Sequence, residues 1–128
     1  MDEYRDLIAR LTAEPATTRQ EDAAVWLLDT HGHWLPRLVA AGFLTDSADG
    51  PGIHWRNTAA ACLGAFEGRM DGSEADWQIL RLALALTGRH VMSLSDLALL
   101  EGTARKQAVI AFAWAAGGRA YADNLLFA

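Results

Sequence analysis

The sequence has little of what many chemical sites require. Among its 128 residues Cys62 is the single cysteine, so neither an internal disulfide nor a multi-cysteine zinc site can form. Nothing in such a chain needs an oxidising compartment, and the acidic, amphipathic start MDEYRDLIARL is not typical of a signal peptide. We therefore expect a cytoplasmic location.

Long apolar runs are also absent. The longest, residues 108–116, is far shorter than the roughly 20 residues that a membrane-spanning helix needs. We therefore expect no membrane as a partner.

Positive charge is scarce, because 11 basic residues face 16 acidic ones and the formal net charge is −5. Nucleic-acid-binding proteins usually carry a basic face, so this balance disfavours nucleic acid as a partner. A glycine-rich phosphate loop, a serine nucleophile elbow and an HExxH motif are all missing from the sequence. No pair of carboxylates lies inside an apolar run, and the aspartates at predicted helix ends or turns are Asp29, Asp46, Asp49, Asp71, Asp76 and Asp96. We predict no catalytic residues and no cofactor, and we favour a non-enzymatic function.

The chain does have ample apolar material for a core. Its hydrophobic content is 52% and its charged content 21%, which is typical of a globular protein. At this length one domain over residues 1–128 is expected. The fold class that we predict is mainly α: a single compact bundle of about five to six helices with one short β-hairpin around residues 43–55.

The most apolar helix is predicted over residues 103–118, TARKQAVIAFAWAAGG, with Thr103 as N-cap and the paired glycines as its end. Because residues 108–116 are all apolar, we expect this helix to be buried on all sides. Its predicted centre comprises Val109, Ile110, Phe112, Ala113 and Trp114.

Caps and apolar spacing predict the other elements. Ser73 with Asp76, and Thr18 with Glu21, have the spacing of capping boxes. Residues 43–45 and 53–55 flank the turn-forming segment DSADGPG, which predicts the hairpin. The remaining helices are predicted over residues 2–13, 18–29, 34–41, 57–66, 73–87 and 97–100.

Three segments in order carry a resemblance: Ile53-His54-Trp55, residues 77–83 (WQILRLA) and residues 113–118. Over roughly residues 34–118 the chain resembles small uncharacterised helical proteins of high-GC bacteria and their mobile elements. His54 stands where that group carries an acid. The resemblance brings no known chemistry, so it assigns no functional residue.

The best local cluster for a metal or ligand is His31-x-His33, at the end of a predicted helix. Two imidazoles can share an ion, but Zn²⁺ needs three or four ligands, which would have to come from Asp29, His54 or His90. The alternative is a histidine pair favoured by the helix dipole, and we assign no metal. His33, His54 and Trp34 also have the chemistry of a pocket mouth, although core packing is the more common role of tryptophan.

Surplus apolar and charged side chains predict a surface for a protein partner or for a second copy, and we expect a dimer. The residues predicted to bind this partner are Tyr4, Leu7, Leu11, Arg105, Lys106, Leu125 and Phe127. The function predicted first is therefore a protein–protein interaction module: an adaptor, inhibitor or accessory protein that can self-associate.

Two alternatives stay open. A winged-helix DNA-binding regulator would use residues 34–41 as recognition helix and DSADGPG as wing, but this helix carries only Arg37 and the wing is acidic. A small-molecule binder would use His31, His33, His54 and Trp34.

Overall fold

The computed structural model describes residues 2–13, 18–47, 50–62, 71–89, 92, 95, 100–118, 120 and 122–123, except for the side chains of residues 2–4 and 47. Within these residues the fold is mainly helical, with six α-helices and one antiparallel hairpin. This confirms the predicted fold class. In chain order the elements are α1 (Asp2–Ala13), α2 (Arg19–His31), α3 (Trp34–Ala41), β1 (Leu44–Ser47), β2 (Gly50–Ile53), α4 (Trp55–Cys62), α5 (Glu74–Leu86) and α6 (Gly102–Gly117).

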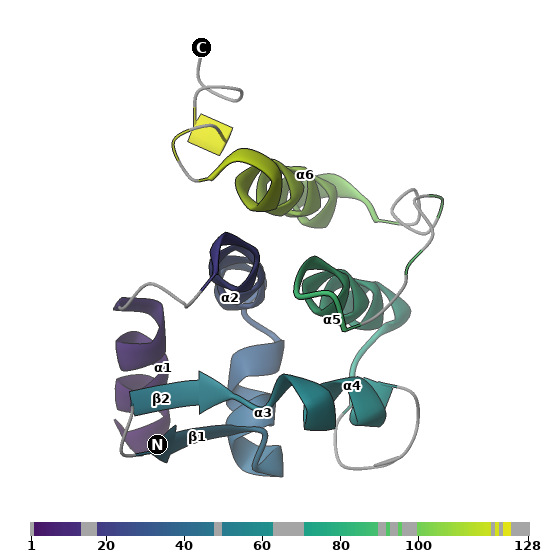
Figure 1. Ribbon diagram of the computed structural model, residues 1–128. Helices are drawn as coiled ribbons and strands as arrows, with labels where there is room; N and C mark the ends of the chain where they lie inside the picture. Colours follow the sequence, from purple (N-terminus) through teal and green to yellow (C-terminus); the bar gives the residue numbers. More distant parts are fainter. Residues whose placement is uncertain are drawn as a thin grey trace.

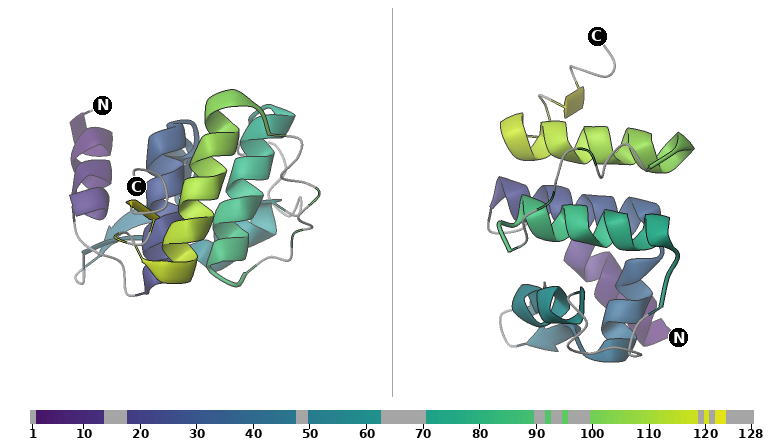
Figure 2. Two further views of the ribbon diagram at one scale, coloured as in Figure 1. Left: turned by 90° about the horizontal axis from the view of Figure 1, so that it is seen from above. Right: turned by 90° about the vertical axis from the view of Figure 1, so that its right-hand side faces the viewer.

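The elements form three layers (Figure 1). Helices α2 and α5 lie side by side in the middle, α6 covers one side of them, and α1, α3, α4 and the hairpin lie on the other side. The side view in Figure 2 shows the same order. Among the described residues, no helix has the length and hydropathy that crossing a membrane requires.

The middle layer supplies most of the core. Leu27 and Leu28 of α2 and Ile79, Leu80 and Leu84 of α5 are fully or almost fully buried. Helix α5 runs antiparallel to α2, because His31 at the end of α2 bonds Asp76 in the first turn of α5, and Arg89 beyond α5 lies beside Glu21. Burying two adjacent apolar helices between two covering layers fixes the arrangement of the bundle.

Local capping signals were predicted well. The predicted bounds of α1 and α3 are confirmed. Ser73 and Asp76 form a complete capping box at the start of α5, and the Thr18 hydroxyl accepts a hydrogen bond from the Glu21 backbone N–H. Helix α2 runs to His31, slightly beyond its predicted end, and Gly32 then ends it in the left-handed conformation that glycine adopts at little cost.

The hairpin lies within the predicted region, but its strands include much of the segment predicted as a loop. β1 and β2 pair antiparallel from Leu44 opposite Ile53 to Ser47 opposite Gly50. Trp55, predicted as strand, instead begins α4. The helix thus starts two residues before its predicted start at residue 57, and Thr58 lies inside it, where its buried hydroxyl donates to the His54 carbonyl.

The prediction that α6 is buried on all sides is wrong. Ala108, Ala111, Ala113 and Trp114 are buried, but Val109 is 56% and Phe112 is 52% exposed. The reason is the layer order, since α6 packs on α2 and α5 with one face only (Figure 1).

The predicted start of α6 also differs. The helix begins at Gly102, one residue before the expected N-cap Thr103, and Glu101 is the N-cap without a side-chain cap hydrogen bond.

Several predictions fall outside the described residues. They are the end of the helix predicted over residues 57–66, most of the helix predicted over residues 97–100, and the terminal side chains of Leu125 and Phe127. The side chain of Tyr4 is likewise outside them.

Candidate functional site

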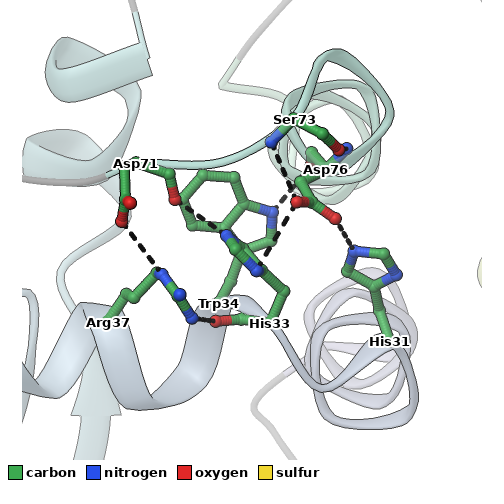
Figure 3. Close-up of polar contacts among 7 residues, drawn as sticks. All are labelled: His31, His33, Trp34, Arg37, Asp71, Ser73 and Asp76. Carbon is green, nitrogen blue, oxygen red and sulfur yellow. Dashed lines mark hydrogen bonds and ion pairs between the residues drawn. The ribbon is translucent and has the colours of Figure 1, made fainter.

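Two histidines from the junction of α2 and α3 meet one carboxylate at the start of α5 (Figure 3). His31 Nε2 lies 2.9 Å from Asp76 Oδ1, and His33 Nδ1 lies 3.5 Å from Asp76 Oδ2. The three side chains are only 14–21% exposed. We call this cluster of His31, His33 and Asp76 the imidazole–carboxylate cluster.

Helix-end geometry places all three members of the cluster. Gly32, with φ of 83°, ends α2 and turns the chain, so that His31 and His33 flank the turn. On the other side, Asp76 Oδ2 accepts a hydrogen bond of 2.9 Å from the Ser73 backbone N–H. Because the capping box holds the Asp76 carboxylate at the helix start, the same group is available to both imidazoles.

Trp34 forms the floor of this cluster. Its indole is fully buried, and its Nε1–H donates a 2.7 Å hydrogen bond to the Asp76 backbone carbonyl. The ring meets His33 edge-on at 4.7 Å and Trp77 at 4.6 Å between centroids. Gly72 closes the other side, because a β-carbon there would lie 2.9 Å from His33 Nε2 and 3.1 Å from the Asp76 β-carbon. A larger residue at this position would therefore have to displace the His33 ring.

The environment of Asp76 changes its acidity. Partial burial by itself would raise the pKa of the carboxyl group, but the hydrogen bonds from Ser73, the bond with His31 and the charge of His33 outweigh burial. The pKa of Asp76 is therefore lowered from its ordinary value of 3.8. A carboxylate held ionised in this way stabilises the folded state at neutral pH.

Arg37 and Asp71 bind the outer edge of the cluster. Arg37 donates to the His33 carbonyl at 2.8 Å and to Asp71 Oδ1 at 3.3 Å, while His33 Nε2 donates to the Asp71 carbonyl at 2.8 Å. His33 can donate to both Asp71 and Asp76 only when both ring nitrogens carry protons.

These contacts also bear on the winged-helix alternative. Arg37, the single cation of α3, is held by contacts within the chain, and Trp34, Leu35 and Leu38 of that helix are buried. The predicted wing includes residues 48–49, which lie outside the described residues. No contact described for α3 favours DNA over the other functions, and the winged-helix alternative stays a prediction.

The predicted set of His31, His33, His54 and Trp34 is brought together only in part. His54 is exposed and its Nε2 lies 2.7 Å from the Thr45 hydroxyl in the hairpin, whereas the other three surround Asp76. In the part of the chain that the structure describes, no group of three or more His, Cys, Asp or Glu side chains is placed to hold a metal ion. His90 lies outside that part.

The cluster joins three elements of the fold, α2, α3 and α5. The Ser73 hydroxyl accepts the Asp76 backbone N–H at 3.1 Å, so it serves the helix cap. Cys62 is half-buried, and burial raises the pKa of its thiol, although Arg81 opposes this effect. A raised thiol pKa lowers the fraction of reactive thiolate. The contacts therefore support a structural latch that ties the end of α2 and the start of α3 to the start of α5.

The Asp76→Asn variant tests this latch through its pH dependence. We expect it to lower the free energy of unfolding by about 1–2 kcal/mol at pH 7, because the shape is kept while the charge facing His31 and His33 is lost. Since the folded-state pKa of Asp76 lies below 3.8, this contribution is full above that value and is lost as the pH falls through the lowered pKa.

Urea unfolding of both proteins between neutral and strongly acidic pH measures the effect. The difference between them should shrink in acid. A difference that stays constant or grows as the pH falls below the ordinary carboxyl range would contradict this role of Asp76.

No protein-family model, curated protein or solved structure matches the chain. The resemblance over residues 34–118 therefore stays a prediction. A proposal for the function therefore rests on the surface of this chain alone.

The predicted partner-binding residues fall into separate groups. Leu7 and Leu11 are half-buried and pack against the core, so they are not a free apolar surface. Arg105 and Lys106 are exposed in the first turns of α6, where Arg105 Nε also donates to the Leu100 carbonyl at 2.8 Å. Leu125 and Phe127 lie outside the described residues, as does the Tyr4 side chain.

Helix α6 has a continuous exposed face that was not predicted from the sequence. Arg105, Lys106, Val109, Phe112 and Ala116 follow helical spacing and are all exposed. We call these five residues the outer face of α6. The two cations mark the side that faces water, and spacing places Val109 and Phe112 on that same side. The unbroken apolar run 108–116 concealed this signal.

Proposed function

We propose that the chain is a non-enzymatic protein–protein interaction module that binds through the outer face of α6, and that its first partner is a second copy of the chain. The observation that carries this proposal is the exposure of Val109 and Phe112, at 56% and 52%. Large apolar side chains grouped on a soluble surface often mark an interface. They lie at the middle of the helix, where a partner helix would cover them most completely.

The order of residues along the outer face supports a second copy. Arg105 and Lys106 precede the apolar pair, and Ala116 follows it. When two α6 helices pack antiparallel about a two-fold axis between them, Val109 of one lies opposite Phe112 of the other. A two-fold contact requires such a self-complementary pattern, in which each of two positions meets the other.

The charges on the helix fit the same arrangement. In the antiparallel pair, Lys106 of one copy lies beside the last turn of the other, where the helix dipole is negative. The last turn of α6 has no basic residue of its own that would repel Lys106 of the other copy. The small residues Ala116 and Gly117 leave room there for the long lysine side chain. The central contact is therefore apolar, and at each end a lysine lies beside the negative end of a helix dipole.

Sedimentation velocity over a range of protein concentrations tests this proposal. We expect the natural sequence to show a reversible monomer–dimer equilibrium. Phe112→Glu should weaken it by at least about 30-fold, the loss of a ~2 kcal/mol aromatic anchor. Phe112 is half exposed in the single chain, so the variant should fold normally.

Asn57→Glu is the matched control, since Asn57 is also an exposed helical position but lies on α4. It should dimerise like the natural sequence. A natural chain that stays monomeric at every concentration would contradict self-association, and so would a Phe112→Glu variant that dimerises as well as the control.

A further inference from the structure

A cavity of about 330 Å³ opens beside the end of α1, between α2 and α6. Helix α2 contributes Asp22, Val25, Trp26 and Asp29 to its wall, and α6 contributes Trp114. The volume is within the usual range for sites that bind small molecules. This cavity is separate from the imidazole–carboxylate cluster and from the outer face of α6, because it shares no residue with either.

The charge of the wall is negative. Asp22 and Asp29 are both carboxylates, and none of the lining residues is Lys, Arg or His. They are seven residues apart on α2, so they lie on one face of the helix, about 10 Å apart along its axis. Asp22 accepts a 3.1 Å hydrogen bond from Trp114 Nε1, whereas Asp29 is exposed.

The wall between the two carboxylates is aromatic and apolar. The rings of Trp26 and Trp114 lie 5.5 Å apart between centroids at an angle of 38°. The hydrogen bond to Asp22 fixes the orientation of the Trp114 indole. Indole faces attract cations, and with Val25 they also provide surface for methylene groups. An aliphatic chain with a positive end matches this combination.

We propose that this cavity binds aliphatic ammonium compounds, with a linear diamine or polyamine as the best fit. One ammonium group pairs with Asp29 at the exposed end, a second reaches Asp22, and the methylene chain lies along Trp26 and Val25. The same ammonium chemistry exists in free polyamines and in the lysine side chain of a partner protein. The site goes beyond the proposed function, since it does not involve the outer face of α6.

Fluorescence titration of the full chain at low salt tests the proposal, because Trp26 and Trp114 line the cavity. The probes are 1,5-diaminopentane, spermidine and N-acetyl-lysine-N-methylamide, with 1,5-pentanediol as an uncharged control of the same length. We expect saturable binding of the amines and none of the diol. Tighter binding of the free diamines assigns the site to polyamines, and tighter binding of the lysine compound assigns it to a partner's side chain.

Asp29→Asn should weaken amine binding about tenfold, as expected for losing one charge-assisted hydrogen bond. Because Asp29 is exposed, this variant should melt like the natural sequence. Asp123→Asn removes another exposed carboxylate and should leave binding unchanged. Phe112→Glu should also leave it unchanged, which separates this site from dimerisation. No saturable amine binding, or equal binding by the diol, overturns the proposal, as does equal affinity in the two asparagine variants.

Discussion

Replacing Trp34 with alanine is expected to lower the free energy of unfolding by about 3–5 kcal/mol, the usual cost of deleting a large buried aromatic side chain. Trp34 is fully buried, and it packs against both His33 and Trp77. The variant also leaves the Asp76 carbonyl without the indole N–H that it accepts at 2.7 Å. Since domains of this size are stable by about 5–15 kcal/mol, Trp34→Ala should remove a large fraction of the total stability.

Urea unfolding followed by circular dichroism measures this loss, and Trp34→Phe separates its two causes. The phenyl ring keeps most of the packing but removes the N–H donor, so we expect an intermediate loss of about 1–3 kcal/mol. A Trp34→Ala variant within 1 kcal/mol of the natural sequence, a margin well inside the ordinary effect of single mutations, would show that this indole is not part of the core.

Replacing Ala111 with leucine should lower the free energy of unfolding by about 1–3 kcal/mol, because extra methylene groups cannot enter a packed layer without displacing it. Ala111 is fully buried on the inner face of α6. Small residues on the neighbouring helices, Ala24 of α2 and Ala83 of α5, are fully buried as well. The bulk of leucine should therefore push α6 away from the middle layer.

The matched control is Ala40→Leu, the same change at an exposed position of α3. It should stay within about 0.5 kcal/mol of the natural sequence, as surface substitutions usually do. Denaturant unfolding at a concentration low enough to keep the chain monomeric compares the two variants. Equal stabilities would contradict the packing of α6 against α2 and α5.

The features that could be predicted from the sequence depend on neighbouring residues. The capping box of Ser73 and Asp76 is complete within one helical turn, so its spacing was sufficient evidence. The same is true of Gly42, whose left-handed conformation ends α3 where expected. Such hydrogen bonds join neighbouring residues, so they do not depend on how distant parts of the chain pack.

The features that were missed depend on tertiary arrangement. The histidine pair and the helix cap were each recognised, but His31 and Asp76 are 45 residues apart and nothing local indicates that they meet. The exposure of Val109 and Phe112 likewise follows from α6 being an outer layer. An apolar helix can be buried on all sides by its own chain, or it can be covered on one side and expose apolar residues on the other. Apolar composition alone does not distinguish these two cases.

Trp55 shows a third kind of difference. It was predicted to belong to the hairpin because residues 53–55 flank the turn-forming segment DSADGPG, yet it is buried as the first residue of α4. The Phe43 carbonyl accepts the His54 backbone N–H, and the helix starts directly after this contact. Burial of the ring in the core therefore outweighs its β-propensity, which is a weak and context-dependent preference.

The central claim is that the outer face of α6 binds a second copy of the chain. Amide chemical shifts recorded at increasing protein concentration test it residue by residue. We predict concentration-dependent shifts at Lys106, Val109, Phe112 and Ala116, with the amides of α3 and α4 unchanged. Shifts confined to the hairpin or to α4, or spectra that do not change with concentration, would contradict it.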